Sequence, residues 1–478
     1  MTFRPASSDP PADLSQSQKN RFAVVGVWRS MLALLLIVLA GQAHAHASEQ
    51  GFVLLLPTDF YVAAGVAAVV LTLMLIVAMP PHAAKRIFRP ASFGKSRRAK
   101  GAVLTSCLAF LIMLAVLAIG LVGPHDPTRN ALPLGFWTLF WVVFVILQGL
   151  FGNLWKWLNP WSGPYTVVRL FRFGQLARLP TGLGYWPALA SFLGFSAVLL
   201  AHPAPSDPDT LALMIASYWV FHFAGMIIFG PKWLRRAEGL SVLLTNYASI
   251  ATLGSCGGRF RIGLTGWKTL TRPAPAISLA IFMIATLAIG SFDGLNETFW
   301  WFAQIGINPL EFPGRTAVVG ENLIGLALVV PMLVIIYGLA VWLGLRIIGQ
   351  HRQFQSAFCT FTPAILPIAL AYHFAHYLPS FLVEIQFVAR MFAGMFDLPP
   401  VQVTTGFFNT IATVRVIWLS QAVAVVAGHV VAILLSHVLA LKLFGSHRKA
   451  AVSQIPLAIF MVAYTFFGLW LLASPRGV

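Results

Sequence analysis

The sequence predicts an all-α fold, an integral membrane bundle of about ten transmembrane helices. Of its 478 residues, 58% are apolar and only 10% are charged, which is far from the composition of a soluble chain. The apolar residues form continuous stretches of about 20 residues, the length that a helix needs to cross a bilayer. Because polar and apolar positions do not alternate in these stretches, a transmembrane β-barrel is not expected.

Charge and motifs exclude several classes of function. The net charge is +18, but the basic residues fall in short runs between apolar stretches, as in membrane-protein loops, so no nucleic-acid partner is expected. The three cysteines have no metal-binding or redox spacing. The chain has no HExxH, GxSxG or Walker motif, and no GxGxxG after a strand. Zincin, serine-hydrolase, ATPase and dinucleotide-binding functions therefore have no support.

The chain is expected to begin with a segment that does not belong to the bundle. Residues 1–18 are polar without any apolar pattern and are predicted to be disordered. Basic residues then precede the apolar run 31–40, and small residues at 41–47 offer a cleavage site. Residues 1–45 therefore form a tail and a signal peptide, or an uncleaved anchor, and residues 46–478 form the transmembrane domain, which starts outside.

Ten apolar windows are long enough to cross about 30 Å of hydrocarbon as helices. They cover residues 60–79, 102–122, 134–152, 185–201, 210–230, 276–292, 322–348, 358–381, 416–441 and 453–474.

The distribution of charge orients these spans. One set of loops contains 23 lysines and arginines, the opposite set contains five, and only one acid, Glu238, falls on the basic side. Basic loops face the cytoplasm, so the mature N-terminus and the C-terminus are both predicted outside. Two cytoplasmic connections, 153–183 and 240–253, mix aromatic and polar residues and are predicted to lie in the membrane interface, with Trp161 as an anchor.

Histidines within the spans are the first candidates for a functional site, because ionisable groups at membrane depth are costly. At 1.5 Å per residue, His222 and His429 lie about 19 Å from the outer end, His373 about 12 Å and His376 about 7 Å. His373 and His376 are three residues apart on one helix face. They could bind zinc or copper together with His222 or His429.

Such a metal would activate water for hydrolysis, with Glu384 or Asp293 from the outer loops as ligand or base. Three alternatives remain open. His222 and His429 could be the axial ligands of a haem, or the histidines could form a proton relay or a metal-ion pathway. In the third alternative, each imidazole bonds only a helix carbonyl, a tyrosine or Gln421 inside the bundle and binds nothing.

Three stretches resemble a known group of proteins. They are GPHDPTRNALPLGFWTLFWVVFVILQGLFGNLWKWLNPW at 123–161, FDGLNETFWW at 292–301 and LAYHFAHY at 370–377. Together with the start of the mature chain, they resemble bacterial polytopic membrane proteins commonly labelled fenitrothion hydrolase. The likeness extends over most of residues 46–440 as scattered short motifs. It implies hydrolysis of an organophosphate ester by a membrane-bound enzyme, and it assigns no catalytic residues.

The sequence thus predicts a multi-pass protein of a bacterial inner membrane with a histidine-lined site in the outer half of the bundle. By resemblance, this site hydrolyses phosphoesters on the periplasmic side. The alternative is a transporter, or a protein that binds metal or haem without hydrolase activity. The expected partners are the lipid bilayer and a small-molecule substrate or ion, and the sequence leaves a protein partner unknown.

Overall fold

The computed structural model describes residues 53, 55–95, 101–171, 175–311 and 314–476. Helices make up almost all of the regular secondary structure in this part of the chain, with one small three-stranded sheet. The prediction of an all-α membrane bundle is therefore confirmed. The predicted tail and signal peptide at 1–45 lie outside the described residues.

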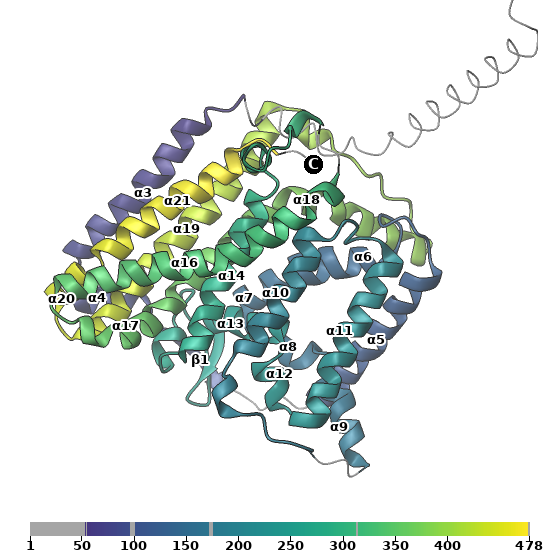
Figure 1. Ribbon diagram of the computed structural model, residues 1–478, viewed down its shortest axis with the longest axis horizontal. Coiled ribbons are helices and arrows are strands. Elements are labelled where there is room, and N and C mark those ends of the chain that lie inside the picture. The colour runs from purple at the N-terminus through teal and green to yellow at the C-terminus, as the bar shows by residue number, and fades with distance from the viewer. Residues whose placement is uncertain (1–52, 54, 96–100, 172–174, 312–313, 477–478) are drawn as a thin grey trace, which may run out of the picture. The chain divides into compact units, whose positions relative to one another are not determined.

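Nine helical segments of the described chain are long and apolar enough to cross a membrane (Figure 1). They are α3 (Thr58–Ala78), α5 (Ala102–Val122), the run Ala131–Phe151, α11 (Pro208–Phe229), α14 (Ile277–Leu295), the run Arg315–Ile347 that contains α16 (Val319–Ile347), the run His351–Met395, α19 (Ile411–Phe444) and α21 (Ile455–Ala473). The remaining predicted window, 185–201, forms the shorter apolar helix α10 (Trp186–Ala201).

The spans differ in how much of their surface the protein itself covers. In α14, 78% of the apolar window is buried, and in the run His351–Met395 72% is buried, whereas α5 has only 11% buried. Because leucine and isoleucine side chains stay exposed along α5 and α16, these faces suit contact with lipid. The helices that bear Asp293 and His376 are therefore the enclosed ones at the centre of the bundle.

Two helices extend further toward the outer side than the apolar windows indicated. The helix α18 (Leu366–Met395) continues past Pro379 for four turns, so Glu384 belongs to a helix rather than to the predicted outer loop 382–414. The helix α14 ends at Leu295, which places Asp293 in its last turn rather than in a loop. Both acids are consequently held on rigid elements that face the bundle.

The third span is irregular in a way that the sequence did not predict. Between α6 (Ala131–Pro133) and α7 (Val145–Phe151), residues Leu134–Phe144 form the π-helix η2. A π-helix is wider than an α-helix and turns its carbonyl groups differently, and such segments are frequent at functional sites. The helix η2 packs against α18.

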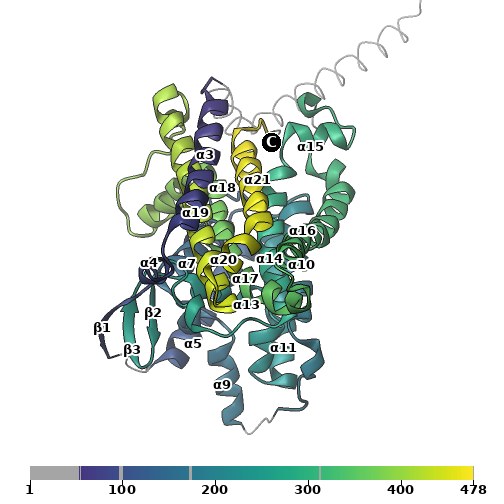
Figure 2. The same cartoon turned by 90° about the vertical axis from the view of Figure 1, so that its left-hand side faces the viewer.

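A small sheet joins two connections that the charge count places on the cytoplasmic side (Figure 2). Strand β1 (Ala91–Lys95) pairs with β3 (Arg259–Ile262), which also pairs with β2 (Leu253–Cys256), and both pairings are antiparallel. The hairpin from β2 to β3 turns through Gly257 and Gly258, which have φ of 59° and 70°. Two successive positive φ values are what a tight hairpin of this kind requires, and glycine adopts them without strain.

The predicted location in the membrane interface is wrong for the connection 240–253 and for the anchor Trp161. The helix α13 (Gly239–Ile250) has all but one of its residues buried and packs against α7 and α10. In the other connection, Trp155 and Trp161 are buried in the protein core instead of facing lipid. Aromatic and polar residues are mixed in both segments because their polar atoms bond within the protein: Trp155 Nε1 donates to Ser241 Oγ at 2.7 Å.

Candidate functional site

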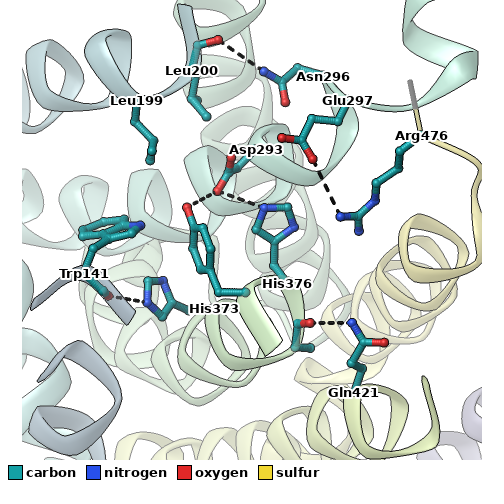
Figure 3. Close-up of polar contacts among 12 residues, drawn as sticks. Trp141, Leu199, Leu200, Asp293, Asn296, Glu297, His373, His376, Gln421 and Arg476 are labelled. Atoms are coloured by element: carbon teal, nitrogen blue, oxygen red, sulfur yellow. Dashed lines mark hydrogen bonds and ion pairs between the residues drawn. The ribbon is translucent and has the colours of Figure 1, made fainter. Parts of the chain in front are cut away.

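A buried acid and a buried histidine meet between α14 and α18 (Figure 3). His376 Nε2 lies 3.3 Å from Asp293 Oδ2, and the side chains are only 6% and 10% exposed. The Tyr377 hydroxyl donates to the same carboxylate oxygen at 2.5 Å. One oxygen of Asp293 thus faces two groups that can each carry a proton. We refer to Asp293, His376 and Tyr377 as the acid–base cluster.

The second nitrogen of His376 is the other half of this arrangement. His376 Nδ1 is buried without a hydrogen-bond partner among the described residues, and so is the hydroxyl of Tyr372, one helical turn earlier. Both face Gly294: a methyl group added there would overlap the Tyr372 hydroxyl and would lie 3.6 Å from His376 Nδ1. Glycine therefore lets two unsatisfied polar atoms point at the same spot beside Asp293.

His373 leaves the same helix but points to a different neighbour. Its Nε2 donates to the main-chain carbonyl of Trp141 at 2.8 Å, and its ring meets the Trp141 ring edge to face at 5.1 Å. Trp141 lies in the π-helix η2. His373 therefore links α18 to η2, next to Tyr377, whose ring centroid lies 4.9 Å away.

A pair of more exposed charges lies near the acid–base cluster in Figure 3. Glu297, just after the end of α14, is 3.7 Å from Arg476, and their side chains are 34% and 17% exposed. The backbone of Arg476 also forms a bridge with Thr298. The pair holds the end of the chain against the segment that follows α14.

His222 belongs to a separate network. Trp233 Nε1 donates to His222 Nδ1 at 3.1 Å, so the other nitrogen, Nε2, carries the proton and donates to Ser191 Oγ, also at 3.1 Å. Both nitrogens are used, which leaves none for a metal or a haem iron in this arrangement. The Tyr218 hydroxyl, 3.1 Å from the same Ser191 Oγ, donates to Glu238.

Glu238 is fully buried, although the sequence indicated only that it was the one cytoplasmic acid. It caps the N-terminus of α13 by accepting from Leu240 N at 2.8 Å and Ser241 N at 2.6 Å. An acid directly before a helical apolar segment is a recognised N-terminal signal, and this signal could have identified the role of Glu238.

His429 and Glu384 each bond a partner outside the acid–base cluster. His429 Nδ1 donates to the Val425 carbonyl of its own helix at 2.9 Å, while its Nε2 is buried without a partner in the described chain. Glu384 Oε2 accepts from Thr138 Oγ1 of η2 at 2.7 Å. Gln421, considered above as a partner for a histidine, instead donates to the Ala375 carbonyl at 2.7 Å.

The four histidines considered as metal ligands therefore lie in different surroundings. His376 faces Asp293, His373 faces a carbonyl, His222 lies in the Glu238 network, and His429 bonds its own helix. Among the residues that the structure describes, no group of three or more His, Cys, Asp or Glu side chains is placed to hold a metal ion. Asp293 and His376 are brought together, as a pair.

Comparison with known proteins adds no family or fold: no family model, curated protein or solved structure matches the chain.

Proposed function

We propose that the chain is a membrane-embedded hydrolase of phosphoesters in which His376 is the general base and Asp293 orients it. The observation that carries the proposal is the pairing of one His376 nitrogen with Asp293, while the other is buried without a partner among the described residues. A carboxylate on one ring nitrogen fixes the proton there and directs the lone pair of the other nitrogen at a reactant. This is the arrangement that general-base catalysis needs.

In the proposed step, His376 Nδ1 takes a proton from water as the water oxygen forms a bond to phosphorus. The bond between phosphorus and the leaving aryl oxygen breaks, and the resulting imidazolium is stabilised by Asp293. The proton then passes to the departing oxygen, so that water and triester give diester and phenol. The hydroxyl of Tyr372, which has no partner among the described residues, is available to donate to the phosphoryl oxygen as its negative charge grows.

The resemblance to proteins labelled fenitrothion hydrolase supports the same site. The stretch 123–161 supplies the Trp141 carbonyl, 292–301 supplies Asp293, and 370–377 supplies His373, His376 and Tyr377. Contacts of 2.8 Å and 3.3 Å join residues from these distant stretches. The three segments that carry the resemblance therefore meet at the acid–base cluster.

The donor set favours acid–base chemistry over a metal. Catalytic zinc sites use three protein ligands, whereas Asp293 and His376 offer two, and His373 already donates to a carbonyl. Zinc or copper would need a third ligand from a rearrangement of the neighbouring helices. A haem held by His222 and His429 would require His222 to give up one of its two hydrogen bonds.

The test is hydrolysis of a nitrophenyl phosphotriester by the purified protein in lipid nanodiscs, followed by the colour of the released nitrophenolate. His376→Ala should abolish turnover. The matched control is His437→Ala, which removes another buried histidine. This variant should retain turnover. A chelator should leave the wild-type rate unchanged. Activity that survives in His376→Ala, or that the chelator removes, contradicts the proposed base.

Proton transfer across the membrane is the second candidate, and it is favoured by the burial of the cluster. The side chains of His376 and Asp293 are only 6% and 10% exposed, so a proton can reach them more easily than a bulky ester can. Buried acids and histidines form proton relays in membrane proteins. The same preparation in liposomes, loaded with a pH-sensitive dye, distinguishes the two functions. Acidification that depends on His376 without any ester hydrolysis would favour transport.

A further inference from the structure

A cavity of about 640 Å³ opens between helices on the side that the charge count assigns to the cytoplasm. It lies between α12 (Lys232–Arg236), α13, the segment before α14, and the end of α19. Neither the acid–base cluster nor the Glu238 network contributes to its walls. It is therefore a separate site.

The mouth of this cavity is strongly cationic. Four basic side chains line it and no carboxylate does: Arg235, Arg236, Arg272 and Lys442. Within the described part of the chain, none of the four forms an ion pair with an acid. Lys442 Nζ donates to the Leu270 carbonyl at 3.3 Å, which holds this cation near the opening. Uncompensated cations that converge on one concave surface attract an anion.

Two buried polar groups inside the cavity also lack partners in the described chain. Asn246 Nδ2 and Thr269 Oγ1 both line the cavity, and their residues are only 4% and 7% exposed. A buried donor left without an acceptor is costly, so native proteins rarely retain one without a reason. An oxyanion in the cavity would accept from both.

The inner walls of the cavity are apolar. Val242, Leu279, Met283, Leu439 and Leu443 line it below the cationic mouth. The last four belong to α14 and α19, which are spanning helices. The cavity thus combines a polar, cationic mouth with hydrocarbon walls, as an amphiphile requires.

We propose that this cavity binds the phosphate group of an anionic phospholipid from the cytoplasmic leaflet. Arg235, Arg236, Arg272 and Lys442 surround the phosphate, Asn246 and Thr269 donate to its oxygens, and the acyl chains lie along α14 and α19. Arginine forks match phosphate oxygens closely, and basic pockets between transmembrane helices on the cytoplasmic side are known sites for anionic head groups. A soluble phosphate would share the polar contacts but would leave the apolar walls uncovered.

The test is titration of the purified full-length protein, in neutral detergent, with fluorescent phosphatidylglycerol, and with phosphatidylcholine in parallel. Phosphatidylglycerol should bind at least tenfold more tightly. Arg272→Gln should weaken its binding about tenfold, because a charged hydrogen bond is lost. The control is Arg259→Gln, which removes an exposed arginine of the sheet on the same side and should change binding less than twofold.

Asn246→Leu tests the cavity without changing any charge. It should weaken phosphatidylglycerol several-fold while the dependence of binding on salt stays as in the wild type. Equal weakening by Arg259→Gln and Arg272→Gln would mean diffuse attraction to a basic surface and would overturn the site. Displacement of the lipid by millimolar inorganic phosphate would overturn the lipid as its ligand and favour a soluble phosphate. Size-exclusion profiles identify any variant that does not fold.

Discussion

Replacing Asp293 with asparagine tests the acid–base cluster most directly, because it removes a charge and leaves the shape. In the wild type, Asp293 Oδ2 accepts from Tyr377 at 2.5 Å and lies 3.3 Å from His376 Nε2. An asparagine can place its one oxygen at the position of Oδ2, where it still accepts from Tyr377 and His376 but carries no negative charge. The tautomer of His376 is then kept, and the imidazolium formed in the proposed step loses the carboxylate that stabilises it.

The loss of this charge makes His376 a weaker base in the proposed step. General-base catalysis by a positioned side chain contributes about 10²- to 10⁴-fold, so the hydrolysis rate should fall by this amount. Stability should fall less, by about 1 to 3 kcal/mol, because hydrogen bonds to the isosteric side chain can be kept. The predicted signature is a large loss of rate in a protein that remains folded.

The assay combines initial rates of nitrophenolate release with thermal unfolding in the same nanodiscs. The nitrogen NMR spectrum of ¹⁵N-histidine-labelled protein reports the tautomer of His376 independently of activity. The control is Glu297→Gln, which removes a half-exposed carboxylate near the cluster and should cost about 0 to 1 kcal/mol. A wild-type rate in Asp293→Asn refutes the reasoning, and so does a changed tautomer of His376, because the loss of rate would then not come from the missing charge. A loss of rate that only follows the unfolded fraction assigns Asp293 a structural role.

Three further predictions concern other buried groups of the protein. His373→Ala leaves the buried Trp141 carbonyl without its donor, so thermal unfolding should show a loss of about 1 to 3 kcal/mol, and an unchanged melting temperature contradicts the link between α18 and η2. Glu238→Gln places an amide NH₂ among backbone donors at the start of α13 and should cost about 1 to 3 kcal/mol with less than a twofold change in turnover; a large loss of turnover in folded protein would make Glu238 part of the reaction. Burial lowers the pKa of Lys268 from 10.5 to about 8, so between these pH values the unfolded chain holds a proton that the folded chain has released, and stability rises with pH. The free energy of unfolding of Lys268→Met, relative to that of the wild type, should therefore be most favourable below pH 8 and should lose this advantage toward pH 10.5. The control Lys449→Met, at an exposed lysine, should show no such dependence on pH. A difference between Lys268→Met and the wild type that does not vary with pH would contradict the lowered pKa of Lys268.

The spans could be predicted from the sequence because hydrocarbon thickness sets the length of an apolar helix. The positions of α5, α16 and α21 follow the apolar windows closely. The structural contacts also agree with the charge count: β1 pairs with β3, and Glu297 with Arg476, each from connections assigned to one side. Helix ends were predicted less well, since α18 continues through polar residues once neighbouring helices enclose it.

The short buried helix α13 could not be predicted, because its sequence resembles that of an interfacial segment. Twelve residues with Asn246 and Tyr247 among apolar neighbours are compatible with either location. The location of α13 is decided by its packing against α7 and α10, and no local sequence pattern indicates this packing. The π-helix η2 was missed for the same reason, because its geometry depends on contacts with α18 rather than on its own residues.

The candidate site was predicted in part. Spacing placed His373 and His376 on one face of one helix, and Asp293 was named as an acid for them. Depth along each helix can be counted from the sequence, but rotation about the helix axis cannot. For this reason His222 and His429, predicted at the same depth, have separate partners. The role of each residue stays a prediction until the variants are measured.

Comparison of the two buried acids gives a physical reason to assign the chemistry to Asp293 rather than to Glu238. Burial alone does not separate them, since both are enclosed. Glu238 accepts from the Tyr218 hydroxyl and from two backbone N–H groups, which cannot give up their protons, and it thereby completes a helix end. Asp293 contacts an imidazole as well as a phenol, and both of these partners can exchange protons.

The imidazole beside Asp293 also keeps one nitrogen without a partner in the described chain. A structural ion pair gains nothing from such a nitrogen, because an unsatisfied buried polar atom lowers stability. A base needs it free to receive a proton. Among the described residues His429 also keeps such a nitrogen, but its other nitrogen bonds a main-chain carbonyl, whereas that of His376 faces a carboxylate, as the proposed base requires.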